Sequence, residues 1–298
     1  MDFPHVGEAA AFATALCWAV TALAFESAGR RVGSLPVNLI RLIAGWLLLA
    51  LFTSIRRGLP FPSDAPASAW LWLGISGLVG FSFGDLCLFR AFVLIGSRLA
   101  VLLMSLVPPM TALIGWGVLG ETMSAREWLG MAMTVGGIMW VVRERVPAAV
   151  EGSRHPSTWG VLLGIGGAVG QAVGLVLSKL GMGDYDAFAS NQIRVLAGIV
   201  GFAAIFTASG LWGRFADALR HPPAMQRTLL GAVFGPFLGV SFSLVAVQHT
   251  MAGVAATIMA ITPVVILPLS FWLRKERVTA RAVIGALLAV AGTAVLVS

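Results

Sequence analysis

Hydrophobic residues follow one another in long runs that are separated by short polar stretches. A membrane-spanning α-helix needs roughly 20 apolar residues, and most of these runs reach or approach that length. A strand interpretation fails because open sheet edges in lipid leave backbone groups without hydrogen-bond partners. The pattern predicts an all-α integral membrane protein with ten transmembrane helices, at about residues 8–28, 37–55, 68–94, 98–119, 126–142, 158–179, 189–209, 227–247, 252–273 and 280–297.

Composition narrows the class of protein further. Of 298 residues, 58% are hydrophobic and 11% are charged, against about 25% charged in soluble domains. This excludes an ordinary water-soluble enzyme and a disordered chain. The net charge of +7 does not predict a nucleic-acid partner, because the arginines cluster between apolar runs, where they orient helices and contact anionic lipid headgroups. The expected partner is the lipid bilayer.

The two halves of the chain resemble each other at an offset of about 153–155 residues. The stretch 38–45 matches 191–198, and a random apolar chain does not repeat Asn, Arg, Pro and Glu in register. The informative matched pairs are Asn38 with Asn191, Arg41 with Arg194, Pro108 with Pro263, and Glu121 with Glu276. The sequence therefore predicts two five-helix repeats, residues 1–147 and 148–298.

Five crossings per repeat have a topological consequence. An odd number forces the second repeat to enter the membrane from the opposite side, which gives an inverted-topology pair. Secondary transporters commonly have this arrangement, with the substrate site near the midplane between the repeats. We therefore expect alternating access around a shared cavity.

At these residues the sequence resembles the drug/metabolite transporter superfamily in its ten-helix EamA-type form. Each copy has an apolar helix, a proline, a turn with glutamate and a Gly-rich helix, although Lys275 replaces the usual glycine before Glu276. The resemblance implies export or exchange of small organic solutes, most plausibly neutral or aromatic amino acids as in YddG-like exporters, across a bacterial inner membrane. Other metabolites or drugs remain alternative substrates. No cofactor is implied.

Polar residues within the apolar runs are the candidates for substrate binding. Asp85 is the most informative, because a carboxylate at depth is costly and by default marks a substrate or ion pathway. Asp85 contacts a substrate ammonium or carries a coupling proton, or it forms an ion pair with an arginine such as Arg90 or lies at an edge position facing lipid headgroups. The sequence leaves these alternatives open. The full set of substrate-binding candidates is Trp18, Ser82, Asp85, Ser105, Gln171, Ser241 and Thr262.

Residues retained in both repeats are the candidates for gating or hinge motion. Pro108 and Pro263 each remove a backbone donor inside an apolar run, so they act as static bends or as hinges. Arg41 and Arg194 either anchor helices at the interface or close gates. Lys179, near a helix end, is expected at the membrane interface.

Rival functions are less consistent with the sequence. The histidines are scattered and lack metal-binding spacing such as H-E-x-x-H, so we expect neither catalytic residues nor a metal. No Walker-type phosphate loop is present, so we do not expect ATP to drive the protein directly. A membrane-embedded enzyme or a channel is the remaining alternative. The small-residue stripe at Gly166, Gly170 and Gly174 permits close helix contacts, and we expect it to pack within a monomer.

The orientation of the termini stays open. The arginine-rich loops lie before even-numbered segments, so the positive-inside rule places both termini outside the cytoplasm, whereas relatives of this architecture are usually drawn with both inside. An even number of crossings puts the termini on the same side in either case.

Overall fold

The computed structural model describes residues 5–144, 157–262, 264–265 and 280–297. Within these ranges the chain is helical with short connections and contains no strand, which confirms the predicted all-α class. Pro263 and the expected boundary between the repeats at 147/148 lie outside the described residues.

The elements of the first half alternate long helices with short turns. In chain order they are α1 (Val6–Val32), α2 (Ser34–Arg57), α3 (Ala67–Gly77), the π-helical η1 (Leu78–Gly84), α4 (Asp85–Met104), α5 (Val107–Leu119) and α6 (Ala125–Glu144).

The second half follows a similar order with one short additional helix, α9, that the apolar pattern did not predict. Its described elements are α7 (Thr158–Met182), α8 (Ala187–Ser209), α9 (Trp212–Leu219), α10 (Pro222–Ala232), the π-helical η3 (Val233–Gly239), α11 (Val240–His249), α12 (Ala252–Met259) and α14 (Ala280–Val297).

Several helices are long and apolar enough to cross a membrane. In the described ranges six spans meet this criterion: Val6–Val32, Ser34–Arg57, Ala67–Leu88, Thr158–Met182, Ala187–Ser209 and Pro222–His249. Val107–Leu119 and Val283–Val297 are shorter apolar helices. Large apolar side chains such as Leu51, Val200 and Leu287 are exposed, as lipid-facing positions require. The count of ten crossings stays a prediction.

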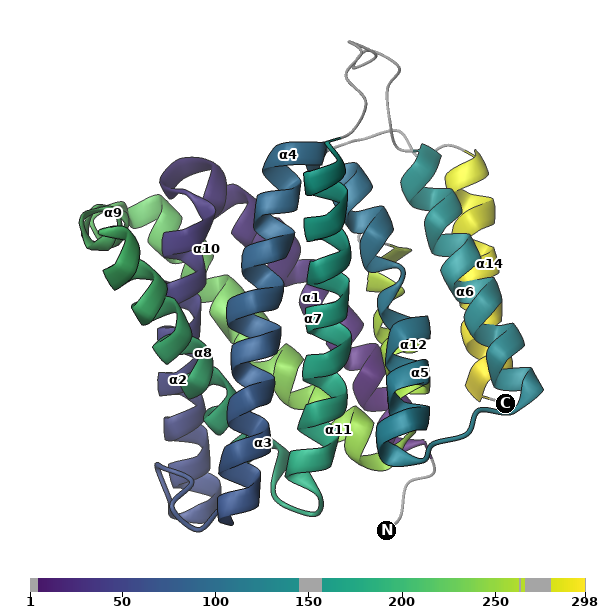
Figure 1. Cartoon of the computed structure of the whole chain (residues 1–298), viewed down its shortest axis with the longest axis horizontal. Coiled ribbons are helices and arrows are strands. Elements are labelled where there is room, and N and C mark those ends of the chain that lie inside the picture. The colour runs from purple at the N-terminus through teal and green to yellow at the C-terminus, as the bar shows by residue number, and fades with distance from the viewer. Residues whose placement is uncertain (1–4, 145–156, 263, 266–279, 298) are drawn as a thin grey trace.

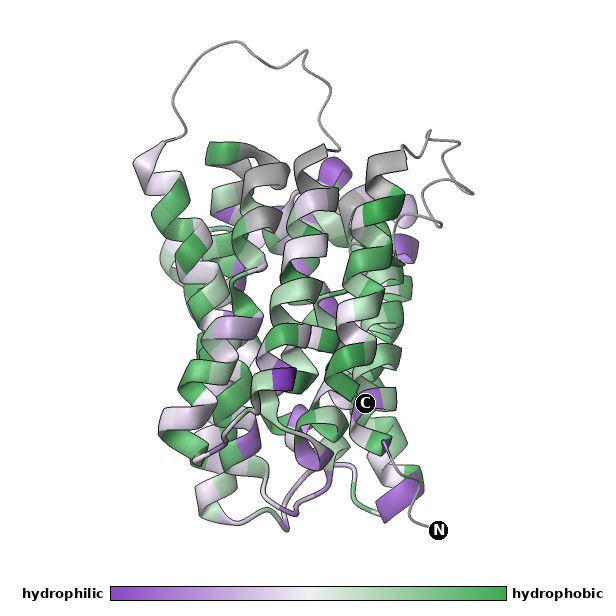
Figure 2. Ribbon diagram, turned by 90° about the vertical axis from the view of Figure 1, so that its right-hand side faces the viewer, coloured by the Kyte–Doolittle hydropathy of each residue, from purple (hydrophilic) through white to green (hydrophobic). Residues whose placement is uncertain are grey.

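The helices stand side by side, and hydrophobic residues cover most of their length (Figures 1 and 2). α1 begins and α14 ends at the lower end of Figure 1, whereas α9 lies at the upper end. Contacts join the two halves throughout: α1 packs on α10, η3 and α11, while α7 packs on α3, η1 and α4. α2 contacts α8, α5 contacts α12, and α6 contacts α14.

Two irregular features recur at equivalent positions in both halves. η1 and η3 are each seven residues long and are 155 positions apart. Turns at residues 105–106 and 260–261 interrupt helices at the same offset. π-helical segments are frequent at functional sites, and proline explains part of the irregularity, because Pro236 lies inside η3 and cannot donate a backbone hydrogen bond.

Pro108 does not bend a continuous helix. It lies in the first turn of α5, directly after the turn that ends α4. Proline is well tolerated there because the first backbone N–H groups of a helix have no intrahelical partner. The chain is therefore broken at this point rather than kinked, and the sequence expectation of a bend is corrected to that extent.

Candidate functional site

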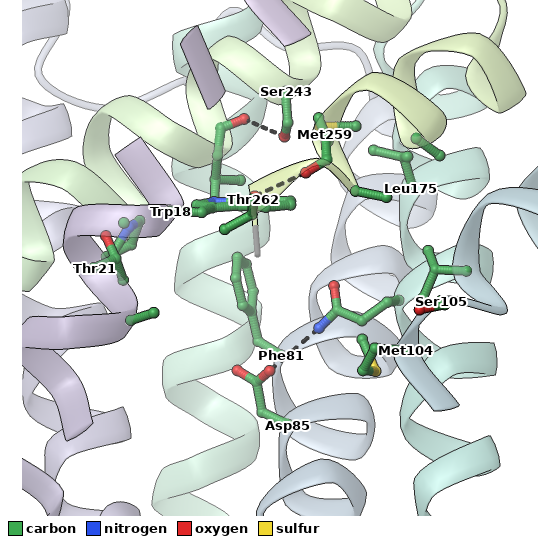
Figure 3. Close-up of a pocket in the computed structure, with 18 of the residues that line it drawn as sticks. Trp18, Thr21, Phe81, Asp85, Met104, Ser105, Leu175, Ser243, Met259 and Thr262 are labelled. Atoms are coloured by element: carbon green, nitrogen blue, oxygen red, sulfur yellow. Dashed lines mark hydrogen bonds between the residues drawn. The ribbon is translucent and has the colours of Figure 1, made fainter. Parts of the chain in front are cut away.

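A cavity of about 400 Å³ lies between helices of the two halves, in the size range of small-molecule sites. Most of the side chains singled out from the sequence line it, and Figure 3 shows several of them in close-up. They are Trp18, Arg41, Asp85, Ser105, Gln171, Arg194 and Thr262.

Asp85 is the centre of a polar network. Its carboxylate forms an ion pair and a hydrogen bond with Arg41, not with Arg90, whose side chain is exposed. Gln171 Nε2 donates a hydrogen bond to Asp85 Oδ1 over 3.2 Å (Figure 3). The Arg41 guanidinium also lies 5.1 Å from the centre of the Phe25 ring, at cation–π distance. Arg41, Asp85 and Gln171 thereby join α2, α4 and α7, and the opposite charges of Arg41 and Asp85 cancel.

Arg194 occupies the position equivalent to Arg41 but has different surroundings. It is 6% exposed, and its Nε donates a hydrogen bond to Ser76 Oγ over 2.9 Å. Its guanidinium lies 5.3 Å from the centre of the Phe81 ring. Among the described carboxylates, none pairs with it.

Broken helices contribute backbone and hydroxyl groups to the cavity. Pro108 has no N–H to give to the carbonyl of Met104, and the hydroxyl of Ser105 is buried without a partner among the described residues. In the second half Thr262 Oγ1 donates to the carbonyl of Met259 over 2.8 Å. The turn after α4 thus brings an unpartnered hydroxyl to the cavity lining, whereas a side chain caps the end of α12.

The remaining wall is largely apolar. Trp18 projects into the space shown in Figure 3, with Phe81 and Leu175 among the other lining residues. The indole of Trp18 is held by α1 against η3, since a Cβ on Gly239 would lie 2.8 Å from its Cδ1 and Nε1 atoms. Aromatic rings of this kind suit stacking on an apolar solute.

Other candidates lie away from the cavity lining. Ser82 Oγ donates to the carbonyl of Gly198 over 3.4 Å, and Ser241 Oγ accepts a hydrogen bond from Asn191 Nδ2 over 3.0 Å. Both serines are buried between helices. Pro108 is buried but is not a lining residue, and Pro263 lies outside the described residues.

Among the lining residues that the sequence interpretation missed are Thr21, Phe81 and Ser243. Thr21 follows Trp18 by three positions, so the helical period placed it on the same face. Ser243 and Ser241 are two positions apart, which puts them on opposite sides of a helix, and only the packing of α11 decides which one faces the cavity.

A second polar cluster joins the two halves at the lower end of Figure 1, where α5, α7, α11 and α12 have their ends or turns. Lys179 Nζ lies 2.5 Å from Glu121 Oε1 and donates to the carbonyl of Thr250 over 2.6 Å. Glu121 Oε2 accepts the backbone N–H of Ala252 over 2.7 Å at the start of α12. Lys179 lies in the last turn of α7, near a helix end as expected, but it is partly buried in a network that joins the two halves.

The loops after α2 and α7 meet at a third cluster. Tyr185 Oη donates to Asp64 Oδ1 over 2.7 Å, and Arg57 contacts both residues. The hydrogen bond from Tyr185 lowers the pKa of the Asp64 carboxyl, and the nearby Arg57 charge lowers it further. These contacts tie the loops of the two halves together at the membrane surface.

No metal centre is evident. Within the ranges that the structure describes, no group of three or more His, Cys, Asp or Glu side chains is placed to hold a metal ion. Cys17 and Cys87 are free and buried.

Known proteins resemble this chain in sequence and in fold. A solved crystal structure superimposes with a TM-score of 0.75 at 20% identity, covering 98% of this chain and 96% of that one, which shows a shared fold. A Sinorhizobium protein named "Uncharacterized transporter in cobO 3'region" is 31% identical over 131 residues, which are 41% of this chain and 92% of the relative.

The model of the EamA-like transporter family matches twice, over residues 5–143 and 158–298. The two matches together cover nearly the whole chain, including every residue of the cavity. The family and the named relative identify a membrane transporter and not an enzyme. The chain belongs to the EamA-like transporter family.

Proposed function

We propose that the chain is a secondary transporter of a bacterial inner membrane that moves small organic solutes, most plausibly neutral or aromatic amino acids, by alternating access. The observation that carries the proposal is the cavity, because residues of both halves line it, and many of them belong to helices long and apolar enough to cross a membrane. Its apolar wall fits a hydrophobic side chain, and its hydroxyl, carbonyl and guanidinium groups fit the polar end of an amino acid.

The alternating motion is proposed to occur between two inverted repeats, residues 1–147 and 148–298. Support comes from the equivalent π-helical segments, from the equivalent helix breaks, and from the two matches to the family model. The breaks border the cavity through Ser105 and Ala260, so a change of angle there alters the cavity directly. Transporters of other folds use discontinuous helices at their substrate sites in the same way.

The Glu121–Lys179 network is proposed as a closed gate. It joins the turn after α5 to α7 and to the turn between α11 and α12. Opening the cavity toward this end requires these bonds to break, and their loss is offset when the opposite end closes.

Asp85 is proposed to carry a coupling proton or to order the binding site through Arg41 and Gln171.

Transport by purified protein in liposomes tests the substrate. We expect counterflow of radiolabelled phenylalanine, threonine or methionine, with saturation at high substrate concentration. Saturation and counterflow separate a carrier from a channel, because a simple pore shows neither. Failure of all three amino acids to cross contradicts the amino-acid proposal.

Labelling from the two sides tests the inverted arrangement. Ser63 and Gly213 are exposed in the connections after the second helix of each proposed repeat. In a background without Cys17 and Cys87, Ser63→Cys and Gly213→Cys should react with a membrane-impermeant maleimide from opposite sides. Labelling of both from one side contradicts the inverted arrangement.

A further inference from the structure

The charges that line the cavity do not cancel. In the part of the chain that the structure describes, the ionisable lining residues are Arg41, Asp85 and Arg194, and Arg41 with Asp85 forms one neutral pair. This leaves the positive charge of Arg194, which no protein environment removes because a guanidinium stays protonated. An unpaired charge inside a membrane protein is costly and is typically part of a substrate pathway.

The surroundings of Arg194 fix its guanidinium and leave donors open. Its Nε–H is taken by Ser76 Oγ, and Ser76 is itself held by the carbonyl of Gly174 at 2.6 Å and by Ser178 Oγ at 2.8 Å. Its face lies on the Phe81 ring. Within the described part of the chain, its terminal Nη groups have no protein acceptor. Such a pre-oriented fork matches the two oxygens of a carboxylate.

Close helix packing keeps this position free of competing side chains. A Cβ on Gly77 would lie 2.2 Å from the carbonyl oxygen of Arg194, and one on Gly80 would lie 3.5 Å from its Nη2 atom. The two glycines therefore let the α3–η1 segment approach the backbone of α8. Arg194 lines the cavity, and among the described residues its Nη groups have no hydrogen-bond acceptor.

From these observations we infer that Arg194 is the carboxylate-binding residue of the cavity, so that the transported solutes are small monocarboxylates with an apolar or aromatic body. This rests on the proposed transport function and narrows its substrate class. A monoanion neutralises the single excess charge, whereas a phosphate dianion leaves a negative charge among apolar walls. The amine of an amino acid is not required, because Asp85, the one carboxylate among the described lining residues, already pairs with Arg41.

Four probes with the same aromatic body separate the roles of the two polar groups. They are phenylalanine, 3-phenylpropanoate, phenylalanine amide and phenethylamine, used as competitors of binding to the purified protein and of uptake into liposomes. We expect phenylalanine and 3-phenylpropanoate to bind at least tenfold more tightly than the amide and the amine.

Variants then assign the preference to one side chain. Arg194→Gln should weaken binding of both carboxylates at least tenfold and abolish the discrimination against the amide, while Arg194→Lys retains part of it. Ser76→Ala, which removes only the Nε acceptor, should weaken carboxylate binding about threefold and covers the case that Arg194→Gln does not fold. Arg90→Gln, an exposed arginine outside the cavity, is the matched control and should change nothing.

Two outcomes overturn the inference and are distinct from failure of the transport proposal. Tight binding of the amide or amine by the unmodified protein excludes a carboxylate requirement but leaves transport intact. Unchanged discrimination in a folded Arg194→Gln or Ser76→Ala protein excludes Arg194 as its source. Absence of both binding and transport for all four probes contradicts the aromatic amino-acid proposal itself.

Discussion

Arg41 and Arg194 are equivalent in sequence, yet they lie in opposite electrostatic settings. Arg41 pairs with Asp85, which also accepts a hydrogen bond from Gln171. Arg194 has a serine and an aromatic ring but, among the described residues, no carboxylate. The cause is visible in the aligned halves, because the position equivalent to Asp85 is Val240 and the position equivalent to Gln171 is Trp18.

Helix packing around the cavity differs in the same way. α7 crosses η1 through Gly170 and Gly174, and a Cβ on Gly170 would lie 2.7 Å from the Cα of Gly84. On the other side α1 crosses η3 through Trp18 and Thr21, whose side chains fill the space against Gly239 and Gly235. A repeated scaffold therefore carries two different chemistries: one crossing is close and polar, and the other places an indole in the cavity.

The largest expected effect concerns the stability of the Arg41–Asp85 pair. Asp85→Ala leaves Arg41 buried without a counter-ion and should lower the free energy of unfolding by about 3–5 kcal/mol. Arg194→Gln should change this free energy by at most about 1 kcal/mol, because the lost hydrogen bond is offset by the removal of a buried charge that has no counter-ion among the described residues. SDS titration in mixed micelles measures both.

A double variant provides the control for that measurement. Arg41→Gln with Asp85→Asn removes both charges and should recover most of the loss, since neither side chain remains an unpaired ion. Equal losses for Asp85→Ala and Arg194→Gln contradict the assignment of one paired and one unpaired arginine.

The close crossing of α7 and η1 predicts the next largest effect. Gly170→Ala forces a methyl group against the backbone of Gly84 and should destabilise the protein by about 1–3 kcal/mol. Gly166→Ala is the matched control, because its Cβ meets only ordinary contacts near Cys87 at 3.5 Å and alanine favours a helix. In detergent, the thermal unfolding midpoint of Gly170→Ala should fall below that of the unmodified protein, whereas the midpoint of Gly166→Ala should not fall. An equal decrease in both variants excludes a specific steric effect at Gly170.

Proton coupling at Asp85 has a thermodynamic limit. With one proton exchanged per solute, a gradient of one pH unit supplies about 1.4 kcal/mol, which is a tenfold change in solute accumulation. Asp85→Asn should hold this accumulation ratio near one while solute exchange continues, since the amide cannot carry the proton. An unchanged response to the gradient assigns Asp85 to ordering of the site alone.

The smallest expected effect concerns the Glu121–Lys179 network. Lys179→Met should favour opening at this end by about 1 kcal/mol, the upper range for partly exposed ion pairs, or about fivefold in population. Ser105→Cys in a background without Cys17 and Cys87 reports cavity access to an impermeant thiol reagent from each side. Arg214→Met, at an exposed arginine of α9, serves as the control, and equal labelling rates with and without Lys179 argue against a gate.

The sequence determined the class of protein and singled out most of the polar side chains that line the cavity. Long apolar runs need no tertiary information to indicate membrane helices, because their length must match the bilayer. The repeat register singled out Arg41 and Arg194, and the cost of polar groups in lipid singled out Asp85 and Gln171. All four line the cavity.

Only the tertiary structure decided which of these groups meet. Helical periodicity predicts the face of a helix on which a side chain lies, but not which helix packs against that face. The pairing of Asp85 with Arg41 and of Lys179 with Glu121 therefore follows only from the packed structure. For the same reason Ser241 faces Asn191 while Ser243 lines the cavity. The unpaired charge of Arg194 is likewise a property of the packed helices, because it depends on where every nearby carboxylate lies.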